Sequence, residues 1–309
     1  MAIGGTMQKK LKIIKKDYFY YLMFLIVLAY FIVFSYVPMY GVTLAFKNYR
    51  ILDGILKSPW AGMRHFNRAF SSPLFWQAFR NTLKISLLRL AVGFPAPIIF
   101  ALLLNEINAR FFKRFLQTAS YLPYFISWVA LSRIVSVILS PNNGIVNQIL
   151  KYFGRESIYF ITEPSYFVGV LIISGIWQSI GWGSVVYLAA ITSVDQEQYE
   201  SAYLDGANRW HCIRYITIPS ILPVISIMLI LSLGGILNAG FDQVFNLYSP
   251  LVYKVGDIID TYVYRAGLLN SDFSFGTAVG LFKNVIGFFL VVSTNFLARR
   301  FGEGEYGLW

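Results

Sequence analysis

The stretch that decides the fold runs from residue 191 to residue 223 and reads ITSVDQEQYESAYLDGANRWHCIRYITIPSILP. It separates two long apolar segments and is too long for a simple turn. Ser193, with Gln196 three positions later, fits a capping box, so we expect a helix to begin there. Asp195 and Glu197 then fall in the first turn, where the helix dipole favours acidic side chains. The segment therefore predicts a short polar helix between two apolar ones.

One face of this predicted helix is small and aromatic, because Tyr199, Ala202, Tyr203 and Gly206 share a side by the i, i+3, i+4, i+7 rule. We expect Gly206 to end or bend the helix. A helix lying on the bilayer surface is the alternative, but such helices usually carry lysine and arginine on their polar face. Here that face carries acidic residues, namely Asp195, Glu197, Glu200 and Asp205. The charge favours docking into a groove of another protein.

The composition of the whole chain indicates a polytopic membrane protein. Of its 309 residues, 57% are hydrophobic and only 13% are charged, against about 25% charged in typical soluble domains. Mean hydropathy is +0.58. A net charge of +11 would suggest nucleic-acid binding in a soluble domain, but here it fits basic residues that flank membrane spans, and we expect no nucleic-acid partner. The single cysteine, Cys212, excludes an internal disulfide framework.

Six segments reach the ~20 apolar residues that a membrane-crossing helix needs. They are Tyr18–Pro38, Thr82–Leu104, Phe115–Leu139, Ser165–Ala190, Ile221–Gly240 and Thr277–Ala298. The first is too long for a signal-peptide core and lacks a small-residue cleavage site. The expected fold class is an all-α membrane protein with six transmembrane helices.

Basic clusters predict the orientation, because cytoplasmic flanks of spans are enriched in lysine and arginine. Such clusters precede the first span, occupy the second–third connection and follow the last span; they comprise Lys9, Lys10, Lys12, Lys15, Lys16, Arg110, Lys113, Arg114, Arg299 and Arg300. Both termini are therefore expected in the cytoplasm. We divide the chain into a basic tail (1–17), a transmembrane domain (18–298) with a cytoplasmic loop at 191–220, and a C-terminal tail (299–309). Met1–Thr6 resembles an added leader or an alternative start and is left out of the fold argument.

Several spans contain helix-breaking or charged residues. Gly93, Pro95 and Pro97 in the second span and Pro123 in the third predict kinks. Three basic residues lie at or near membrane depth, namely Arg89, Arg133 and Lys283. Each either marks a solute pathway or extends to the nearest interface, which is the reading we favour for Lys283.

The chain carries no recognisable catalytic motif. A phosphate-binding G-x-x-x-x-G-K-[ST] loop is absent, so the chain cannot bind ATP in that manner, and energy must come from another subunit or from an ion gradient. His65, His211 and Cys212 make no metal-ligand spacing of a recognised type. The competing hypothesis is a membrane-embedded glycosyl- or acyltransferase that uses the acidic residues after the fifth span: Asp242, Asp257, Asp260 and Asp272. Solvated loop charges explain those residues more simply.

The loop also resembles a known family motif. Glu200-Ser-Ala202-x-x-Asp205-Gly206-Ala207, followed by Ile216-Thr-Ile-Pro219 and by Pro223, resembles the EAA loop of binding-protein-dependent ABC importer permeases. One departure is Ser201, where the family favours alanine. The resemblance covers about Asn81 to Arg300. Leu122-Pro-Tyr-Phe-Ile-Ser-Trp128 and Ile176-Trp-Gln-Ser-Ile-Gly-Trp182 are similar to the carbohydrate-uptake branch, especially to permeases for oligosaccharides derived from polysaccharides.

This resemblance implies a type I ABC importer permease fold in the bacterial cytoplasmic (plasma) membrane. It implies a second homologous permease, two cytoplasmic ATPases that bind ATP and magnesium, and an extracytoplasmic solute-binding protein. The chain itself would need no cofactor and no metal. The residues that would couple it to an ATPase are Glu200, Ala202, Asp205, Gly206, Ala207, Ile216 and Pro219.

The path of the sugar is expected to combine aromatic faces with oriented polar groups, as ligand pockets generally do. The candidates are Trp177, Gln178, Trp182, Tyr187, Asn238, Phe241 and Arg133. Tryptophan and tyrosine also form interfacial belts, which is the alternative role for the aromatic members of this set. Arg133 or Arg89 could favour acidic sugars such as uronates through bidentate contacts with a carboxylate.

Overall fold

The computed structural model describes residues 16–301, with side-chain surroundings given as far as residue 296. The basic tail before Lys16 and the Arg299–Arg300 pair lie outside the residues whose side chains are described. Within the described range the chain is nearly all helical, and its extended pairing is a bridge between Lys47 and Trp60. The expected all-α class is confirmed.

The helices follow one another through short connections. Those of the first half are α2 (Tyr18–Phe31), η1 (Ile32–Tyr36), α3 (Val37–Met39), η2 (Tyr40–Phe46), α4 (Gly54–Lys57), α5 (Arg64–Phe70), α6 (Pro73–Leu88), η3 (Arg89–Gly93), α7 (Pro95–Asn105), α8 (Arg110–Tyr121), η4 (Leu122–Phe125), α9 (Trp128–Ile138) and α10 (Ile145–Tyr152). Those of the second half are α11 (Pro164–Thr192), α12 (Gln196–Leu204), α13 (Arg209–Cys212), η5 (Ile213–Thr217), α14 (Ile218–Gly234), α15 (Phe241–Leu247), η6 (Pro250–Val252), α16 (Tyr253–Gly256), α17 (Ile259–Val263), η7 (Tyr264–Leu269) and α18 (Phe273–Phe301).

Five continuous helical stretches of the described chain are long and apolar enough to cross a membrane. They are Tyr18–Phe46, Pro73–Asn105, Pro164–Thr192, Arg209–Gly234 and Phe273–Phe296. A bent pair, Arg110–Phe125 and Trp128–Ile138, makes a sixth if the two helices are counted as one span. Each of the six predicted segments therefore has its counterpart.

The third span is not the continuous helix that the sequence predicts. Its two halves meet at an angle of 111°, and the break follows Pro123 by three residues. Pro123 lies in the 3₁₀ turn η4, Ile126 is extended with φ −89° and ψ 131°, and Ser127 is also extended before the helix restarts. The 3₁₀ turn keeps the chain helical past the proline, so the turn in direction comes at Ile126–Ser127.

The second and fifth spans also depart from a regular helix, in each case next to a proline or a glycine. In the second, the hydrogen bonding changes to the π pattern over η3, where Phe94 N donates to Arg89 O at 3.2 Å, just ahead of Pro95. In the fifth, the helix ends at Gly234 rather than at the predicted Gly240. Gly240 instead takes a left-handed φ of +79° and precedes α15. Both interruptions lie in the middle of the chain's helical body.

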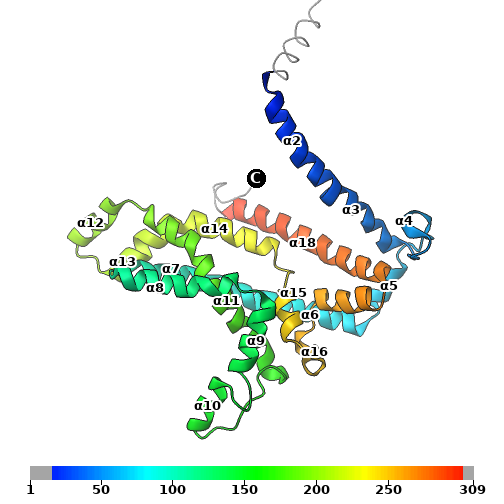
Figure 1. The fold of residues 1–309 in the computed structure, drawn as a ribbon. Helices are drawn as coiled ribbons and strands as arrows, with labels where there is room; N and C mark the ends of the chain where they lie inside the picture. The colour runs from blue at the N-terminus through cyan, green and yellow to red at the C-terminus, as the bar shows by residue number, and fades with distance from the viewer. Residues whose placement is uncertain (1–15, 302–309) are drawn as a thin grey trace, which may run out of the picture.

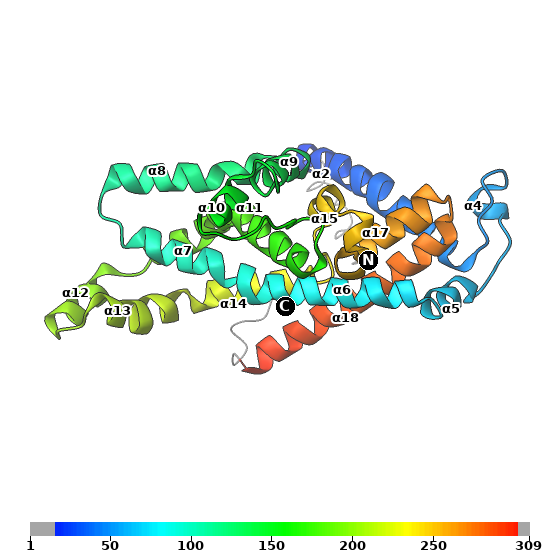
Figure 2. The ribbon, with the colours of Figure 1, turned by 90° about the horizontal axis from the view of Figure 1, so that it is seen from below.

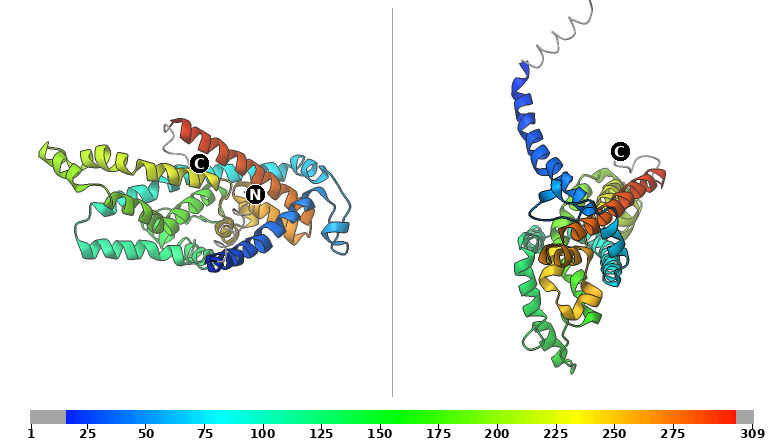
Figure 3. Two further views of the ribbon diagram at one scale, coloured as in Figure 1. Left: turned by 90° about the horizontal axis from the view of Figure 1, so that it is seen from above. Right: turned by 90° about the vertical axis from the view of Figure 1, so that its right-hand side faces the viewer.

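The helical body is elongated, with the polar helices α12 and α13 at one end and α4 and α5 at the other (Figures 1 and 2). Its core has three main parts: one between α11 and α15, one at the α5 end around Phe75 and Phe275, and one at the α12 end around Ala101 and Ile221. The part of the first span that precedes η2 stands apart from this body (Figure 3), and α2, η1 and α3 contain no buried residue. The end of the span, η2, packs against α5 and α18.

Ion pairs join the helices at the α5 end of the body. Lys283 on α18 is 8% exposed and donates to both carboxylate oxygens of Asp260, at 2.6 and 2.8 Å. It therefore binds a partner inside the protein and does not extend to an interface. Arg265 makes a two-pronged contact with the buried Asp257, at 2.8 and 2.6 Å. The hydrogen bonds to Asp257 raise the pKa of Arg265 above its ordinary value, against the lowering effect of burial.

Candidate functional site

The polar loop forms the predicted helix, α12, but its N-cap differs from the expected one. Asp195, not Ser193, caps the helix: its Oδ1 accepts a hydrogen bond from Glu197 N at 3.0 Å. Ser193 is the C-cap of α11, and its hydroxyl donates to Ala190 O. The long helix before the loop extends further than the capping pattern suggested, so the next helix begins after Asp195.

The other end of α12 is fixed by a glycine, as the sequence predicts. Gly206 has φ +81°, Ala207 N donates to Ala202 O at 2.9 Å and Gly206 N donates to Tyr203 O at 3.1 Å. These two bonds make a Schellman motif, in which a left-handed residue satisfies the last carbonyl groups of a helix. The direction in which the chain leaves α12 is thereby set.

α12 is attached to the helical body along one side. Tyr199 Oη lies 2.9 Å from Thr217 Oγ1 in a hydrogen bond, and Tyr199 packs on the core part around Ile221. Arg209 pairs with Glu106 at the end of α7, at 3.5 Å. Tyr199 therefore faces inward, toward the body, while Tyr203 and Gly206 further along the chain are exposed. The exposed residues of the loop include large apolar groups, namely Tyr203, Leu204, Trp210 and Tyr215, and the acidic residues Glu200 and Asp205.

The other coupling candidates surround this attachment. Ala202, Ala207 and Ile216 are half-buried, and Ile216 packs on the same core part as Tyr199. Pro219 is exposed in the first turn of α14. The seven predicted residues thus lie in and directly behind one protruding helix, at the end of the body opposite to α4 and α5 (Figure 1).

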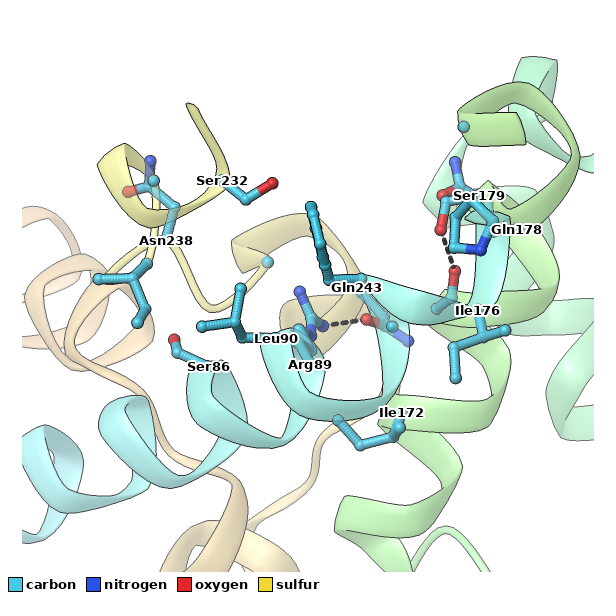
Figure 4. A pocket seen from close by; sticks show the side chains of 18 of the residues that line it. Ser86, Arg89, Leu90, Ile172, Ile176, Gln178, Ser179, Ser232, Asn238 and Gln243 are labelled. Atoms are coloured by element: carbon cyan, nitrogen blue, oxygen red, sulfur yellow. Dashed lines mark hydrogen bonds between the residues drawn. The ribbon is translucent and has the colours of Figure 1, made fainter. Parts of the chain in front are cut away.

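A second feature is a cavity of about 440 Å³ in the body, where the second and fifth spans are interrupted. Its volume is within the usual range for small-molecule pockets, about 300–1,000 Å³. Figure 4 shows its polar side chains, which come from α6, η3, α11, α14, α15 and the segment between α14 and α15. Those that line it are Ser86, Arg89, Gln178, Ser179, Ser232, Asn238 and Gln243. Apolar and aromatic groups such as Trp128 and Ile176 complete the wall.

Three of the seven predicted sugar-path residues line this cavity: Gln178, Tyr187 and Asn238. The other four lie outside its lining. Trp177 and Arg133 are exposed on α11 and α9, Trp182 stacks on Tyr124 at 5.2 Å, and Phe241 stacks on Phe245 at 5.3 Å.

The cavity also contains groups that the sequence did not single out. Gln243 is 1% exposed, and its Nε2 donates to Leu171 O and Ser174 Oγ, each at 2.8 Å. Its Oε1 accepts a hydrogen bond from Arg89 Nη2. Arg89, by contrast, is among the charges at membrane depth that the sequence did single out, and Ser86 lies three positions before it in the same apolar span.

The acidic residues after the fifth span do not form a catalytic cluster. Asp257 pairs with Arg265, Asp260 with Lys283 and Asp272 with Arg68. The expectation that these are solvated loop charges was wrong for Asp257, which is 3% exposed. These three aspartates form structural ion pairs, and Asp242 is exposed in the first turn of α15, which leaves the transferase hypothesis without support. Among the described residues no group of three His, Cys, Asp or Glu side chains could hold a metal ion.

Comparisons with known proteins agree with this geometry. Residues 93–303 match the family model described as the binding-protein-dependent transport system inner membrane component. The chain is 44% identical over 293 residues to the polygalacturonan/rhamnogalacturonan transport system permease protein YteP of Bacillus subtilis, covering 95% of this chain and 91% of that one. Protein LplB of the same organism is 41% identical over 290 residues, which cover 94% of this chain and 91% of that one.

Solved structures give the same result. A chain from a bacterial ABC transporter involved in the import of the acidic polysaccharide alginate superposes with a TM-score of 0.89 at 41% identity, covering 94% of this chain and 99% of that one. A chain of the bacterial alginate ABC transporter in complex with an alginate pentasaccharide-bound periplasmic protein also superposes with a TM-score of 0.89. It is 40% identical in sequence, and the match covers 96% of this chain and 99% of that one. The chain described here belongs to the family of binding-protein-dependent transport system inner membrane components, and it is a multi-pass permease without an ATPase of its own.

Proposed function

We propose that this permease moves acidic oligosaccharides, derived from uronate-containing polysaccharides, into the cell. The observation that carries the proposal is the cavity between the interrupted second and fifth spans, with a basic side chain, Arg89, in its wall. The relatives support the acidic class, because polygalacturonan and alginate both consist of uronate sugars. Gln178, Tyr187 and Asn238 are the proposed additional contacts with the sugar.

We further propose that α12 couples the cavity to a cytoplasmic ATPase. The helix is exposed on its outer side, acidic, and held rigidly by the Schellman motif and the Tyr199–Thr217 bond. A rigid docked element can transmit the difference between two states of a partner, because it moves as a body. The proposed coupling residues remain those of the loop motif, which are Glu200, Ala202, Asp205, Gly206, Ala207, Ile216 and Pro219.

The proposed assembly has three kinds of protein partner. Two ATPase subunits bind ATP and magnesium, a second homologous permease completes the pathway, and a solute-binding protein delivers the sugar from outside. The exposed first span supports the second permease, since α2 makes no buried contact within this chain. Lipid covers whatever apolar surface the partners leave free.

The orientation that fits this assembly has both termini in the cytoplasm and the loop around Lys57 outside. A reporter enzyme fused after Trp309 is expected to lie in the cytoplasm, and a reporter enzyme inserted at Lys57 is expected to lie outside the cell. Lys57 and the α12 helix lie at opposite ends of the body (Figure 2), so a third reporter at Leu204 is expected to match the one after Trp309. A cytoplasmic signal at Lys57 would contradict the orientation.

The substrate class is tested by uptake into proteoliposomes that contain the whole importer and its binding protein. We expect ATP-dependent accumulation of oligogalacturonate or alginate oligosaccharides, and no accumulation of neutral maltooligosaccharides of the same length. Uptake of the neutral chains without the acidic ones would contradict the proposal. Omission of the ATPases or of ATP serves as the control.

A further inference from the structure

Arg89 is a cation without a counter-ion in the part of the chain that the structure describes. The ion pairs found there involve other residues. Its Nη2 donates to a neutral amide oxygen, that of Gln243, and its buried Nε has no partner. A buried charge is costly unless it is paired and fully hydrogen-bonded, and charged residues inside membrane spans commonly mark solute pathways. Apart from the Gln243 amide oxygen, the described chain supplies no acceptor for this guanidinium, which is half-buried at the cavity wall.

The position of the guanidinium is fixed by its surroundings. The amide of Gln243 has one orientation, because its Nε2 must face the carbonyl of Leu171 and its Oε1 then faces Arg89. Gly240 lies against the guanidinium, and a Cβ at that position would overlap it. Arg89 is thus held at the cavity wall by a polar anchor and by a glycine that leaves room for it.

A second unsatisfied donor lies one turn away on the same helix. Ser86 lines the same cavity, its side chain is buried, and its hydroxyl has no hydrogen-bond partner in the structure. Neighbouring hydroxyls behave differently: Thr82 Oγ1 donates to Ala78 O at 2.8 Å, the usual bond for such a residue in a helix. Because Ser86 and Arg89 are three positions apart, they share one face of the second span (Figure 4).

We propose that Arg89 and Ser86 form a carboxylate-binding subsite, which takes one uronate carboxylate of the passing oligosaccharide. A carboxylate is an acceptor with two oxygens, so it satisfies the guanidinium and the hydroxyl together. This proposal rests on the proposed function. It assigns the selectivity for acidic oligosaccharides to the side chains of Arg89 and Ser86. Gln243 and Gly240 hold the guanidinium but need not touch the sugar.

The test uses the reconstituted importer with its binding protein, and compares oligogalacturonate with its methyl ester of the same length. Arg89→Gln is expected to lower uptake of the acidic chain about tenfold or more, because it loses a charged hydrogen bond, and to leave uptake of the ester unchanged. Arg89→Lys retains the charge and is expected to fall between wild type and Arg89→Gln. Ser86→Ala is expected to lower acidic uptake several-fold. The matched control is Ser136→Ala on α9, outside the cavity lining, whose hydroxyl already donates to Ser132 O at 2.7 Å, and it is expected to transport as wild type does.

Direct binding separates this proposal from the function on which it rests. Oligogalacturonate is titrated into the detergent-purified complex, and Arg89→Gln is expected to weaken binding by the same factor as uptake, without lowering the melting temperature of the complex. Equal binding by wild type and Arg89→Gln overturns the subsite, even if the importer moves acidic sugars. Equal loss for the acid and the ester, or a lower melting temperature, also overturns it and assigns Arg89 to packing against a partner. Failure of the wild-type importer to take up any acidic chain is instead a failure of the proposed function.

Discussion

Replacing Gly206 by tryptophan is expected to uncouple ATP hydrolysis from transport while the membrane helices stay folded. Gly206 has φ +81°, and no atom of the rest of the chain lies within 4 Å of the place where a Cβ would be, so an added side chain points into open space. If α12 docks in a cleft of an ATPase, the indole occupies the space that the cleft wall needs. A docking loss of about 1.4 kcal/mol lowers occupancy tenfold, and we expect transport per importer to fall by at least that factor.

Two control substitutions separate the size of the side chain from the strain in the backbone. Gly206→Asn introduces a small residue that tolerates the left-handed region, and it is expected to retain most of the transport. Gly154→Trp places the same indole at another glycine with positive φ, +72°, and open space around it, in the α10 to α11 connection. It is expected to leave coupling intact. Uptake and ATPase rates are measured on one preparation, and normal transport by Gly206→Trp would remove α12 from the coupling role.

The spans could be predicted from the sequence because each is an apolar run of sufficient length, a property that needs no knowledge of neighbours. Their ends were harder to predict. Ser193 fits an N-cap, but its hydroxyl belongs to the end of α11, since the preceding helix continues that far. The fifth helix stops at Gly234 although apolar residues continue, because glycines there do not support further helix. Composition alone does not decide between two helices that compete for the same residues.

The cavity was only partly predictable, because α11 is apolar around nearly its whole circumference. The residues of α11 that line the cavity follow one helical stripe: Ile172, Gly175, Ile176, Ser179, Gly183 and Tyr187, with Gln178 at its edge. Trp177 falls off that stripe, and Trp182 contacts Tyr124 instead. Which stripe faces the cavity depends on where α6 and α14 pack. Likewise, Arg89 and Gln243 are 154 positions apart, and no local pattern links them.

The close packing of α8 against α11 leads to the second large expected effect. Gly181 on α11 is buried, and a Cβ there would overlap the carbonyl group of Ser120, which is backbone and has no rotamer to change. Small residues at membrane helix contacts let backbones approach in this way. Gly181→Ala is expected to destabilise the protein by about 1–3 kcal/mol, as overpacked cores generally do. Gly181→Leu is expected to force α8 and α11 apart and to abolish recovery of folded protein.

The matched control lies on the same helix. Gly169 has nothing within 4 Å of an added Cβ. Gly169→Leu therefore changes the intrinsic helix propensity as Gly181→Leu does, but without the overlap. The Gly169→Leu protein is expected to have a melting temperature equal to or above that of the wild type. Thermal melting of detergent-purified protein compares the two. The stacked pair Tyr124 and Trp182 lies next to this contact, so in a background where the other six tryptophans are replaced by phenylalanine, the fluorescence of Trp182 reports separation of α8 from α11 independently of melting. If Gly181→Leu melts as Gly169→Leu does and keeps the wild-type emission, the two helices do not pack through Gly181. In that case contacts other than the one at Gly181 must hold the bend of the third span, because α11 would no longer fix the direction of α8, the half of the span that precedes the bend.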